Sequence, residues 1–469
     1  MLAELISKIN DFFWADCIKF NLSNGNQIGF SFLCILLISV GLYFFISTKF
    51  LPIKFLPDMF RQVKSSLKIK NKNSVSGLQT VIISTATRVG MGNLLGVAAA
   101  ISGGGAGAVF WMWLSALINS STAFIESVLA QLHKKEDKLY GGYKGGPAYY
   151  IHDFFVDKLK FKRKNLISVL FALSGLICWC GISQVVGNSV SSVFQDAFNI
   201  PGIISASILF IFGAVIVLRR DTTVRVLNFI VPAMAFIYLF ITFLIMIVNL
   251  NKIPMVISNI FCQAFGLKQI IFGGVGIAIT EGVKRGIFSN EAGSGSAPCA
   301  AATAESKKPI EIGFLQVFGV LVDTIVCTCT AMLILLTPEK IINKLNGMEL
   351  LQKALRYHLG YFGIIFIAVI LFLFSFSTFL GILFYARSNV SYLAGENWWS
   401  QNIFKIIALI MLFCGGIYSY NIVWMLADVG IALMTFLNLI MIIFLRKEAF
   451  DVLKNYCAEK KTVTKNNFF

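Results

Sequence analysis

Long apolar stretches alternate with short polar connections along nearly the whole chain. A helix needs about 20 apolar residues to cross a bilayer, and eleven stretches meet that length within a few residues at each end. They cover 28–47, 78–101, 108–132, 166–193, 203–219, 227–249, 268–304, 312–336, 361–387, 402–419 and 424–446. The pattern predicts an all-α integral membrane protein with about 11 transmembrane helices and no extramembrane domain.

Two of these stretches are interrupted by clustered glycines. The second contains V-G-M-G-N over 89–93, and the seventh contains F-S-N-E-A-G-S-G-S-A-P over 288–298. As one helix, residues 268–304 would run about 55 Å, far more than the roughly 30 Å of a bilayer core. Because glycine loses the most conformational freedom on helix formation, we expect a discontinuous helix at both places. The alternative is that these glycines serve close helix packing.

The interrupted stretches are the second and the seventh, so spans 2–6 and 7–11 form two units of five. Since five is odd, the second unit enters the membrane from the opposite face, which gives an inverted 5+5 repeat core. This arrangement is typical of secondary transporters with a binding site at the midplane. The predicted organisation is a lead-in with an extra helix and a basic amphipathic segment (1–77), a first repeat (78–249), a second repeat (250–446) and a cytoplasmic tail (447–469).

Composition supports a membrane protein and charge orients it. The chain is 57% hydrophobic and only 13% charged, which excludes a soluble enzyme, a disordered protein and a coiled coil. Its net charge of +17 would suggest nucleic acid in a soluble protein. Here Lys and Arg crowd into connections 48–77 and 133–165, and connections 102–107, 194–202 and 420–423 have none. The positive-inside rule then predicts a plasma (inner) membrane protein with its N-terminus outside and its C-terminus in the cytoplasm, and no nucleic-acid partner.

No motif for catalysis or metal chemistry is present. The sequence has no H-E-x-x-H, Walker loop or nucleophile elbow. Cys178 and Cys180, like Cys327 and Cys329, are two residues apart, which puts their thiols on nearly opposite helix faces. We therefore expect no enzyme activity and no organic cofactor. Residues 1–27 are interpreted as an amphipathic interfacial lead-in without a removable signal peptide.

Several motifs together resemble the alanine/glycine:cation symporter family, the sodium:alanine symporters. In chain order they are G-M-G-N-L-L-G-V (90–97), G-G-A-G-A-V-F-W-M-W (104–113), G-G-P-A-Y-Y-I (145–151), R-G-I-F-S-N-E-A-G-S-G-S-A-P (285–298) and F-S-T (376–378). The resemblance implies a leucine-transporter-type fold with one extra helix before the core. It also implies sodium-coupled uptake of small neutral amino acids such as alanine or glycine. Two positions depart from the family pattern: Met91 replaces a small or hydroxylated residue, and Gln184 lies four rather than two residues before Asn188.

The two interruptions supply groups that suit a zwitterionic amino acid. Backbone N–H groups freed at a helix break attract a carboxylate, helped by the dipole of the following half-helix, and carbonyl and side-chain oxygens accept from an ammonium. The predicted substrate residues at the interruptions are Gly90, Met91, Gly92, Asn93, Phe288, Ser289 and Asn290, and the resemblance adds Gln184 and Trp424. For Asn93 the alternative is a helix cap, and for Trp424 an anchor at the membrane interface.

The resemblance also implies a sodium site, and sodium as a hard cation prefers oxygen ligands. The matching positions are the carbonyls of Ala86 and Val89 and the hydroxyls of Ser377 and Thr378; the alternative is that these hydroxyls bond to their own helix. Charged residues inside the spans are further candidates: Arg88, Glu126, Glu281, Lys284, Arg285, Glu291, Asp323 and Asp428. Glu281 and Glu291 have basic neighbours in sequence, whereas Asp323 has none and is the best candidate for an ion path.

Two other functions remain open at this point. A proton-coupled transporter would use Asp323 or Glu126 as the proton carrier. An ion channel would need a continuous pore, and paired interruptions in inverted halves favour alternating access instead.

Overall fold

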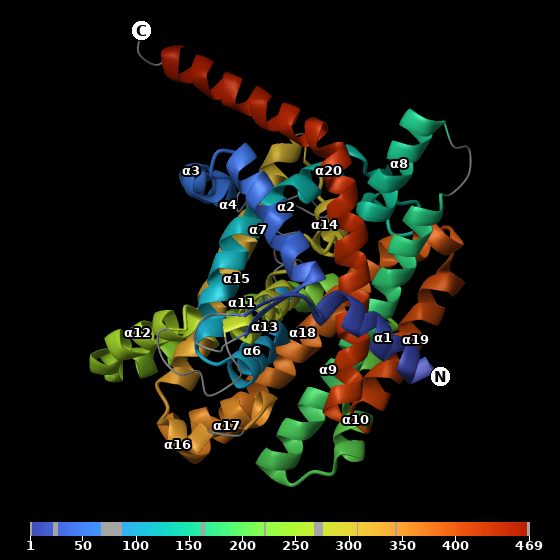
Figure 1. Cartoon of the computed structure of the whole chain (residues 1–469). Helices are drawn as coiled ribbons and strands as arrows, with labels where there is room; N and C mark the ends of the chain where they lie inside the picture. The colour runs from blue at the N-terminus through green and yellow to red at the C-terminus, as the bar shows by residue number, and fades with distance from the viewer. Residues whose placement is uncertain are drawn as a thin grey trace.

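The computed structural model describes residues 2–21, 27–66, 87–160, 165–219, 222–266, 275–306, 308–342 and 345–466, most of them in helices (Figure 1). Among the described residues, seven helices are long and apolar enough to cross a membrane: α7 (Gly107–Leu132), α9 (Leu166–Phe198), α11 (Thr222–Val248), α15 (Pro309–Leu335), α18 (Tyr361–Ala394), α19 (Trp398–Gly415) and α20 (Tyr420–Asn466). Shorter apolar helices are α2 (Phe32–Ser47), α10 (Gly202–Val217) and residues Gly92–Gly104. The predicted helical membrane fold is confirmed, and the count of eleven spans stays a prediction.

The remaining elements are short. The helices among them are α1 (Leu2–Trp14), α3 (Leu51–Lys54), α4 (Leu56–Ser66), η1 (Gly92–Gly96), α6 (Val97–Gly104), α8 (Pro147–Leu159), η2 (Leu250–Lys252), α12 (Ile253–Ala264), α13 (Val275–Asn290), α14 (Ala297–Ala301), α16 (Glu339–Ile342) and α17 (Gly347–Leu359). Two small antiparallel hairpins pair β1 (Asp16–Asn21) with β2 (Gln27–Ser31) and β3 (Lys135–Glu136) with β4 (Tyr143–Lys144).

Both expected interruptions are present. α13 ends at Asn290, and the chain turns through 291–296 before α14 begins at Ala297. In this turn Glu291, Gly293 and Gly295 have φ angles of 57°, 89° and 80°, a left-handed backbone that glycine adopts at no steric cost. At the other interruption, Val89 and Gly90 are not helical and η1 is a π-helical turn. Such turns are rare and are frequently found at functional sites.

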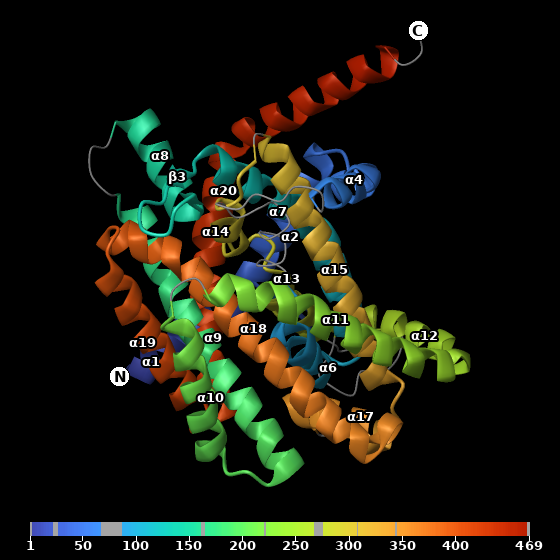
Figure 2. The same cartoon turned by 180° about the vertical axis from the view of Figure 1, so that it is seen from behind.

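α9 lies at the centre of one half of the molecule and packs against α18, α19 and α20. Small residues let it approach α20 closely: a Cβ on Gly430 would lie 2.3 Å from Cys178 Cα, and one on Gly181 would lie 2.5 Å from Ala427 N. α7 packs against α13 and α15 in the other half. In the view from behind, α13 and α18 lie near the middle of the molecule, between α9 and α15 (Figure 2). The elements that carry the interruptions are thus enclosed by long helices.

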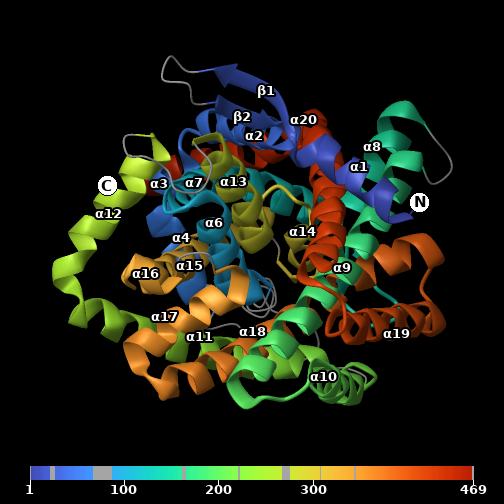
Figure 3. The same cartoon turned by 60° about the horizontal axis from the view of Figure 1, so that its bottom comes forward.

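The N-terminal lead-in is more structured than the sequence indicated. α1 is followed by the β1–β2 hairpin, which was not predicted from the sequence, and both lie on the same side as α2 (Figure 3). Trp14 Nε1 donates to the backbone carbonyl of Asp428 in α20 at 3.2 Å, and the indole is buried. The lead-in therefore docks on the core through a specific hydrogen bond as well as through apolar contact.

Ion pairs join several segments at the end of the molecule from which α20 projects. The buried Asp58 of α4 accepts from Lys460 Nζ at 3.0 and 2.7 Å. His133, just after α7, lies 3.1 Å from Asp153 Oδ2 and 2.8 Å from Glu448 Oε2. Burial disfavours the charged imidazole, but these two carboxylates outweigh it and raise the pKa of His133 to about 9. The imidazolium therefore ties α8 and α20 to the end of α7 at neutral pH.

Candidate substrate and ion site

The two interruptions are in direct contact at a glycine. A Cβ on Gly92 would lie 3.1 Å from Ser289 Cα and 3.4 Å from the carbonyl oxygen of Phe288. One turn further along η1, a Cβ on Gly96 would lie at an ordinary 3.6 Å from the carbonyl oxygen of Arg285. Only a residue without a side chain fits at 92 without displacing the backbone of the second interruption. The sequence-predicted residues Gly92, Phe288 and Ser289 are thus brought together.

A buried aspartate of α15 bridges both interruptions. Asp323 Oδ1 accepts from Asn93 Nδ2 at 2.7 Å and from Ser289 Oγ at 2.7 Å. Cys327 Sγ lies 3.1 Å from the same Asn93 nitrogen and 3.2 Å from Ser289 Oγ. All four side chains are buried. Asp323 thus touches side chains from both interrupted helices.

Asp323 forms no direct ion pair in the described part of the chain. A small hollow of about 10 Å³ lies beside it, lined in part by Asn290, Thr324 and Cys327. This is about the smallest space that holds one water molecule. Burying an ionised carboxylate in such surroundings costs free energy unless a cation lies beside it or a proton binds to it. This position can therefore take a cation or a proton.

Arg88 joins the first interruption to the end of α13. Its Nε donates to the backbone carbonyl of Asn290 at 2.9 Å, and its Nη1 donates to the Gln316 carbonyl at 3.0 Å and to Gln316 Oε1 at 2.9 Å. The guanidinium is fully buried. Because the last carbonyls of a helix lack partners within it, Arg88 stabilises the place where α13 stops.

Two more buried carboxylates surround the turn at 291–296. Glu126 of α7 accepts from the backbone N–H of Gly293 at 3.2 Å and from Asn438 Nδ2 at 2.8 Å. Glu291 accepts from the Tyr385 hydroxyl at 3.1 Å. Neither carboxylate forms an ion pair among the described residues. With Asp323, three buried carboxylates face one buried Arg88, so the centre lacks positive charge.

The hydroxyls proposed for sodium lie beside the first interruption. Thr378 Oγ1 accepts from the backbone N–H of Met91 at 3.2 Å and donates to its own helix at the Phe374 carbonyl, 2.9 Å away. Ser377 Oγ also donates to that carbonyl, at 2.9 Å. Both hydroxyls thus bond back to α18, and a hydroxyl that donates keeps lone pairs for a cation. Val89, two residues before Met91, is buried. Ala86 lies outside the described residues.

Three other predicted residues have defined contacts. Gly90 donates its N–H to Asn93 Oδ1 at 2.9 Å, so Asn93 also caps the interruption, as the alternative interpretation proposed. Asn290 Oδ1 accepts from the N–H of Ala292 at 2.9 Å. Gln184 Nε2 lies 3.2 Å from Met411 Sδ of α19. The side-chain contact of Gln184 is therefore with α19 and not with a residue of either interruption.

Trp424 of α20 lies against the second interruption and is only 4% exposed. Its ring centre is 4.7 Å from that of Phe288, and the Arg285 guanidinium carbon lies 4.4 Å from it on the ring face. Trp424 therefore lies inside the molecule and packs against Phe288.

Basic residues one turn before the second interruption pair with acids. Asp428 lies 2.6 Å from Lys284 Nζ and 3.3 Å from Arg285 Nη1, and Glu281 lies 3.3 Å from Arg285 Nε. The sequence indicated the local Glu281–Arg285 contact but not the role of Asp428, because α20 is distant in sequence. Glu291 also has basic neighbours in sequence, but its carboxylate forms no ion pair with them and accepts from the Tyr385 hydroxyl.

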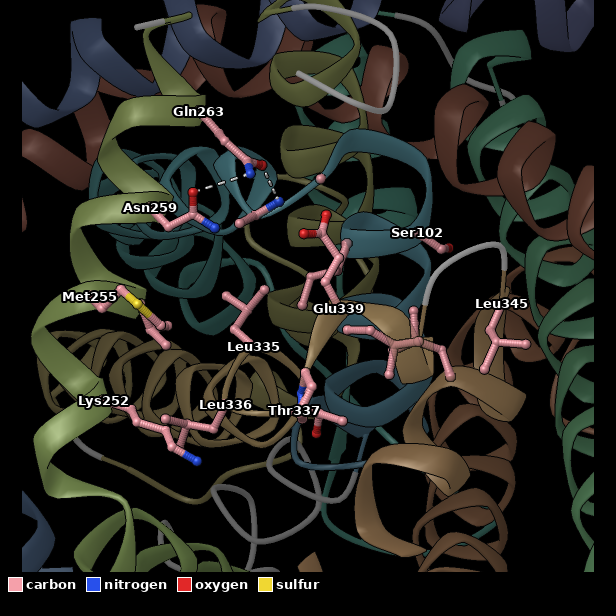
Figure 4. A pocket seen from close by; sticks show the side chains of 17 residues that line it. Ser102, Lys252, Met255, Asn259, Gln263, Leu335, Leu336, Thr337, Glu339 and Leu345 are labelled. Atoms are coloured by element: carbon pink, nitrogen blue, oxygen red, sulfur yellow. Dashed lines mark hydrogen bonds between the residues drawn. The ribbon is translucent and has the colours of Figure 1, made fainter. Parts of the chain in front are cut away.

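A separate hollow of about 370 Å³ lies at the far end of α6, between α12 and the end of α15 (Figure 4). Its polar wall is internally bonded: Gln263 Oε1 accepts from the N–H of Ala106 at 2.8 Å, and Gln263 Nε2 donates to Asn259 Oδ1 at 3.3 Å. It is lined by Ser102 rather than by residues of the interruption, so it does not belong to the site around Asp323.

Comparison with known proteins identifies the family. The model of the sodium:alanine symporter family matches residues 16–469. The chain belongs to the sodium:alanine symporter family. It is therefore a multi-pass membrane transporter of an amino-acid carrier family, and the predicted resemblance is confirmed.

Named relatives within this family differ in substrate and ion. "Amino-acid carrier protein AlsT" of Bacillus subtilis is 39% identical over 435 residues, which cover 92% of this chain and 90% of that protein. "Probable sodium/glutamine symporter GlnT" of the same species is 37% identical, covering 98% and 92%. "Sodium/proton-dependent alanine carrier protein" of Bacillus sp. (strain PS3) is 32% identical, covering 81% and 88%. A solved structure, "Crystal structure of MhsT in complex with L-phenylalanine", aligns with a TM-score of 0.48 at 12% identity, covering 81% of this chain and all of that chain.

Proposed function

We propose that this protein is a secondary active transporter that couples the uptake of a small neutral amino acid, such as alanine or glycine, to sodium. The observation that carries the proposal is the bridge from Asp323 to Asn93 and Ser289, because one buried carboxylate touches both interrupted helices. A cation bound there would hold the two interruptions together. Alternating access around a central site of this kind is the mode typical of inverted-repeat transporters.

The amino acid binds between the interruptions in this proposal. Its carboxylate lies toward the backbone of Gly90, Met91 and Gly92, and its ammonium toward carbonyl and hydroxyl oxygens near Phe288 and Ser289. The Met91 N–H now donates to Thr378, so a substrate carboxylate would have to replace or share that bond. Close contact at Gly92 and the aromatic wall of Phe288 and Trp424 favour a small substrate.

Sodium has two candidate positions. One is the predicted set at Val89, Ser377 and Thr378, with Ala86 from outside the described residues. The other is Asp323, a buried carboxylate without a direct ion pair among the described residues, which a bound cation would neutralise. Proton coupling is the second candidate function, since Asp323 and Glu126 are both buried without ion pairs among the described residues and a relative is named as sodium/proton-dependent.

Orientation follows from the charge distribution. Connections 48–77 and 133–165 carry α4 and α8, which lie at the end from which the C-terminus projects (Figure 1). We propose that this end faces the cytoplasm and that the N-terminus faces outside, in the plasma (inner) membrane.

Uptake of labelled alanine into proteoliposomes tests the proposed function. We expect accumulation under an inward sodium gradient with the proton gradient abolished, and little accumulation under a proton gradient alone in sodium-free buffer. Accumulation that follows only the proton gradient would replace sodium by proton coupling. Competition of unlabelled glutamine, alanine and glycine with labelled alanine would rank the affinities of these substrates.

A further inference from the structure

The hollow of about 370 Å³ beside α6 lies where two membrane spans end (Figure 4). The apolar span of α11 ends at Val248, and α15 ends at Leu335, which lines the hollow. Helix α12 begins at Ile253, directly after η2, and lines the hollow from another side. Because both spans stop at this level, the hollow lies near a membrane surface, which is the outer one in the proposed orientation.

Helix α12 has one buried face and one exposed apolar face. Val256, Ile260 and Ala264 are at most 3% exposed, whereas Met255 and Phe261 are 67% and 42% exposed. The helix extends from the side of the bundle (Figures 1 and 2). A short helix that follows a span and turns large apolar side chains outward is typical of a segment at the membrane interface. Lipid is therefore expected to surround the outer face of α12.

The C-terminal end of α12 is held closely by α7. A Cβ on Gly107 would lie 2.6 Å from the Ala264 nitrogen, and Trp111 Nε1 donates to the Ala264 carbonyl at 3.4 Å. The part of α12 that begins beside Lys252 and reaches Asn259 lines the hollow instead. Protein interiors are normally packed without gaps of this size, so the space between α12 and the end of α15 calls for an occupant.

The wall of the hollow suits an apolar ligand. Apolar side chains make up most of its lining, among them Val256 of α12 and Leu336 at the end of α15. Its uncharged polar side chains are bonded within the protein: Ser102 donates to the carbonyl of Ala99, Thr337 to that of Leu333, and Gln263 to Asn259. Water in such a space finds few free partners, and apolar cavities bind apolar molecules instead. The volume is within the range of about 300–1,000 Å³ that is usual for small-molecule sites.

We propose that this space, the α12 hollow, binds an acyl chain of a phospholipid from the surrounding leaflet. The chain enters past Met255, which is exposed and also lines the hollow. Lys252 and Glu339 line it as well, and both are exposed, so the lipid phosphate lies toward Lys252 and an ammonium toward Glu339. These two charges fit the head group of phosphatidylethanolamine better than that of phosphatidylglycerol, which has no ammonium. The inference goes beyond the proposed function, because its ligand is a lipid and not the transported amino acid.

Photolabelling of the unmutated protein locates the chain. The probe is a phosphatidylethanolamine with a diazirine on one acyl chain, in proteoliposomes of unlabelled phosphatidylethanolamine, and peptide mass spectrometry identifies the labelled residues. Exposed side chains such as Phe261 take label from any nearby lipid. We expect label also on Val256 and Leu336, which are each 3% exposed and line the hollow, so that only a chain inside it reaches them. Label confined to exposed side chains would overturn the proposal.

Filling the hollow is the second test. In Ser102→Trp the new ring occupies the space, and we expect the labelling of Val256 and Leu336 to fall about fivefold. Ser258→Trp is the matched control, because Ser258 is an exposed serine of α12 that does not line the hollow, and its labelling should equal that of the unmutated protein. Both variants are compared as monodisperse protein. Unchanged labelling of Val256 and Leu336 in Ser102→Trp would contradict a chain in the hollow.

Competition with unlabelled lipids tests the head group. Phosphatidylethanolamine should reduce the labelling of Val256 about threefold more than the same amount of phosphatidylglycerol, and the double variant Lys252→Gln, Glu339→Gln should remove this difference. Equal competition by the two phospholipids in the unmutated protein would overturn the head-group assignment. Palmitate that competes as well as phosphatidylethanolamine would replace the phospholipid by a free fatty acid. Failure of the proposed function is a separate result, the absence of sodium-driven alanine uptake, and it leaves the α12 hollow standing.

Discussion

Asp323→Asn should lower sodium-driven alanine uptake by about a hundredfold or more, which corresponds to about 2.7 kcal/mol. The variant keeps the size of the side chain but removes a negative charge that contacts both interrupted helices through Asn93 and Ser289. A sodium ion bound at Asp323 would lose its charged ligand, and a proton would lose its carrier. Initial uptake rates in proteoliposomes, normalised to protein recovered as a monodisperse peak, measure the effect.

The control for this variant is Cys327→Ala, one helical turn further along α15. Its thiol contacts the same Asn93 and Ser289 groups, but its removal leaves the carboxylate in place. We expect its uptake to stay within about threefold of normal, because a thiol is only a weak hydrogen-bonding group. Sodium-dependent uptake by Asp323→Asn at a rate similar to that of Cys327→Ala would contradict a role for the charge.

Gly92→Val is expected to abolish transport. Its Cβ alone would approach Ser289 Cα to 3.1 Å, and the two γ-methyl groups of valine enlarge the conflict. Because the obstructing atoms are backbone of the second interruption, the two interruptions must move apart, and interiors yield little to extra volume. Gly92→Ala should give an intermediate rate.

The matched control is Gly96→Ala, in the same π-helical turn, where the added Cβ would have an ordinary contact of 3.6 Å. Normal uptake is expected there. If Gly92→Val is recovered as folded protein and transports alanine normally, then close contact between the interruptions is not required for transport.

The sequence predicted the interruptions well because their cause is local. Clustered glycines at 90, 92, 293 and 295 and the length of segment 268–304 are visible without any contact information. The backbone angles of Gly293 and Gly295 show why those glycines are needed there. The same local logic indicated the Glu281–Arg285 pair, since residues four apart lie on one helix face.

Contacts between segments that are distant in sequence could not be predicted from the sequence. Asn93 and Asp323 are 230 residues apart, and the sequence marked both as candidates without joining them. The docking of Trp14 on α20 and the pairing of Asp428 with Lys284 likewise depend on which helices become neighbours.

The central claim is that sodium and the amino acid stabilise each other at the paired interruptions. The direct measurement is the affinity of the purified protein for alanine at several sodium concentrations, with choline keeping the ionic strength constant, together with its affinity for sodium with and without alanine. Since linkage in binding is reciprocal, we predict that sodium tightens alanine binding and that alanine tightens sodium binding by the same factor. Alanine affinity that is indifferent to sodium would contradict the account.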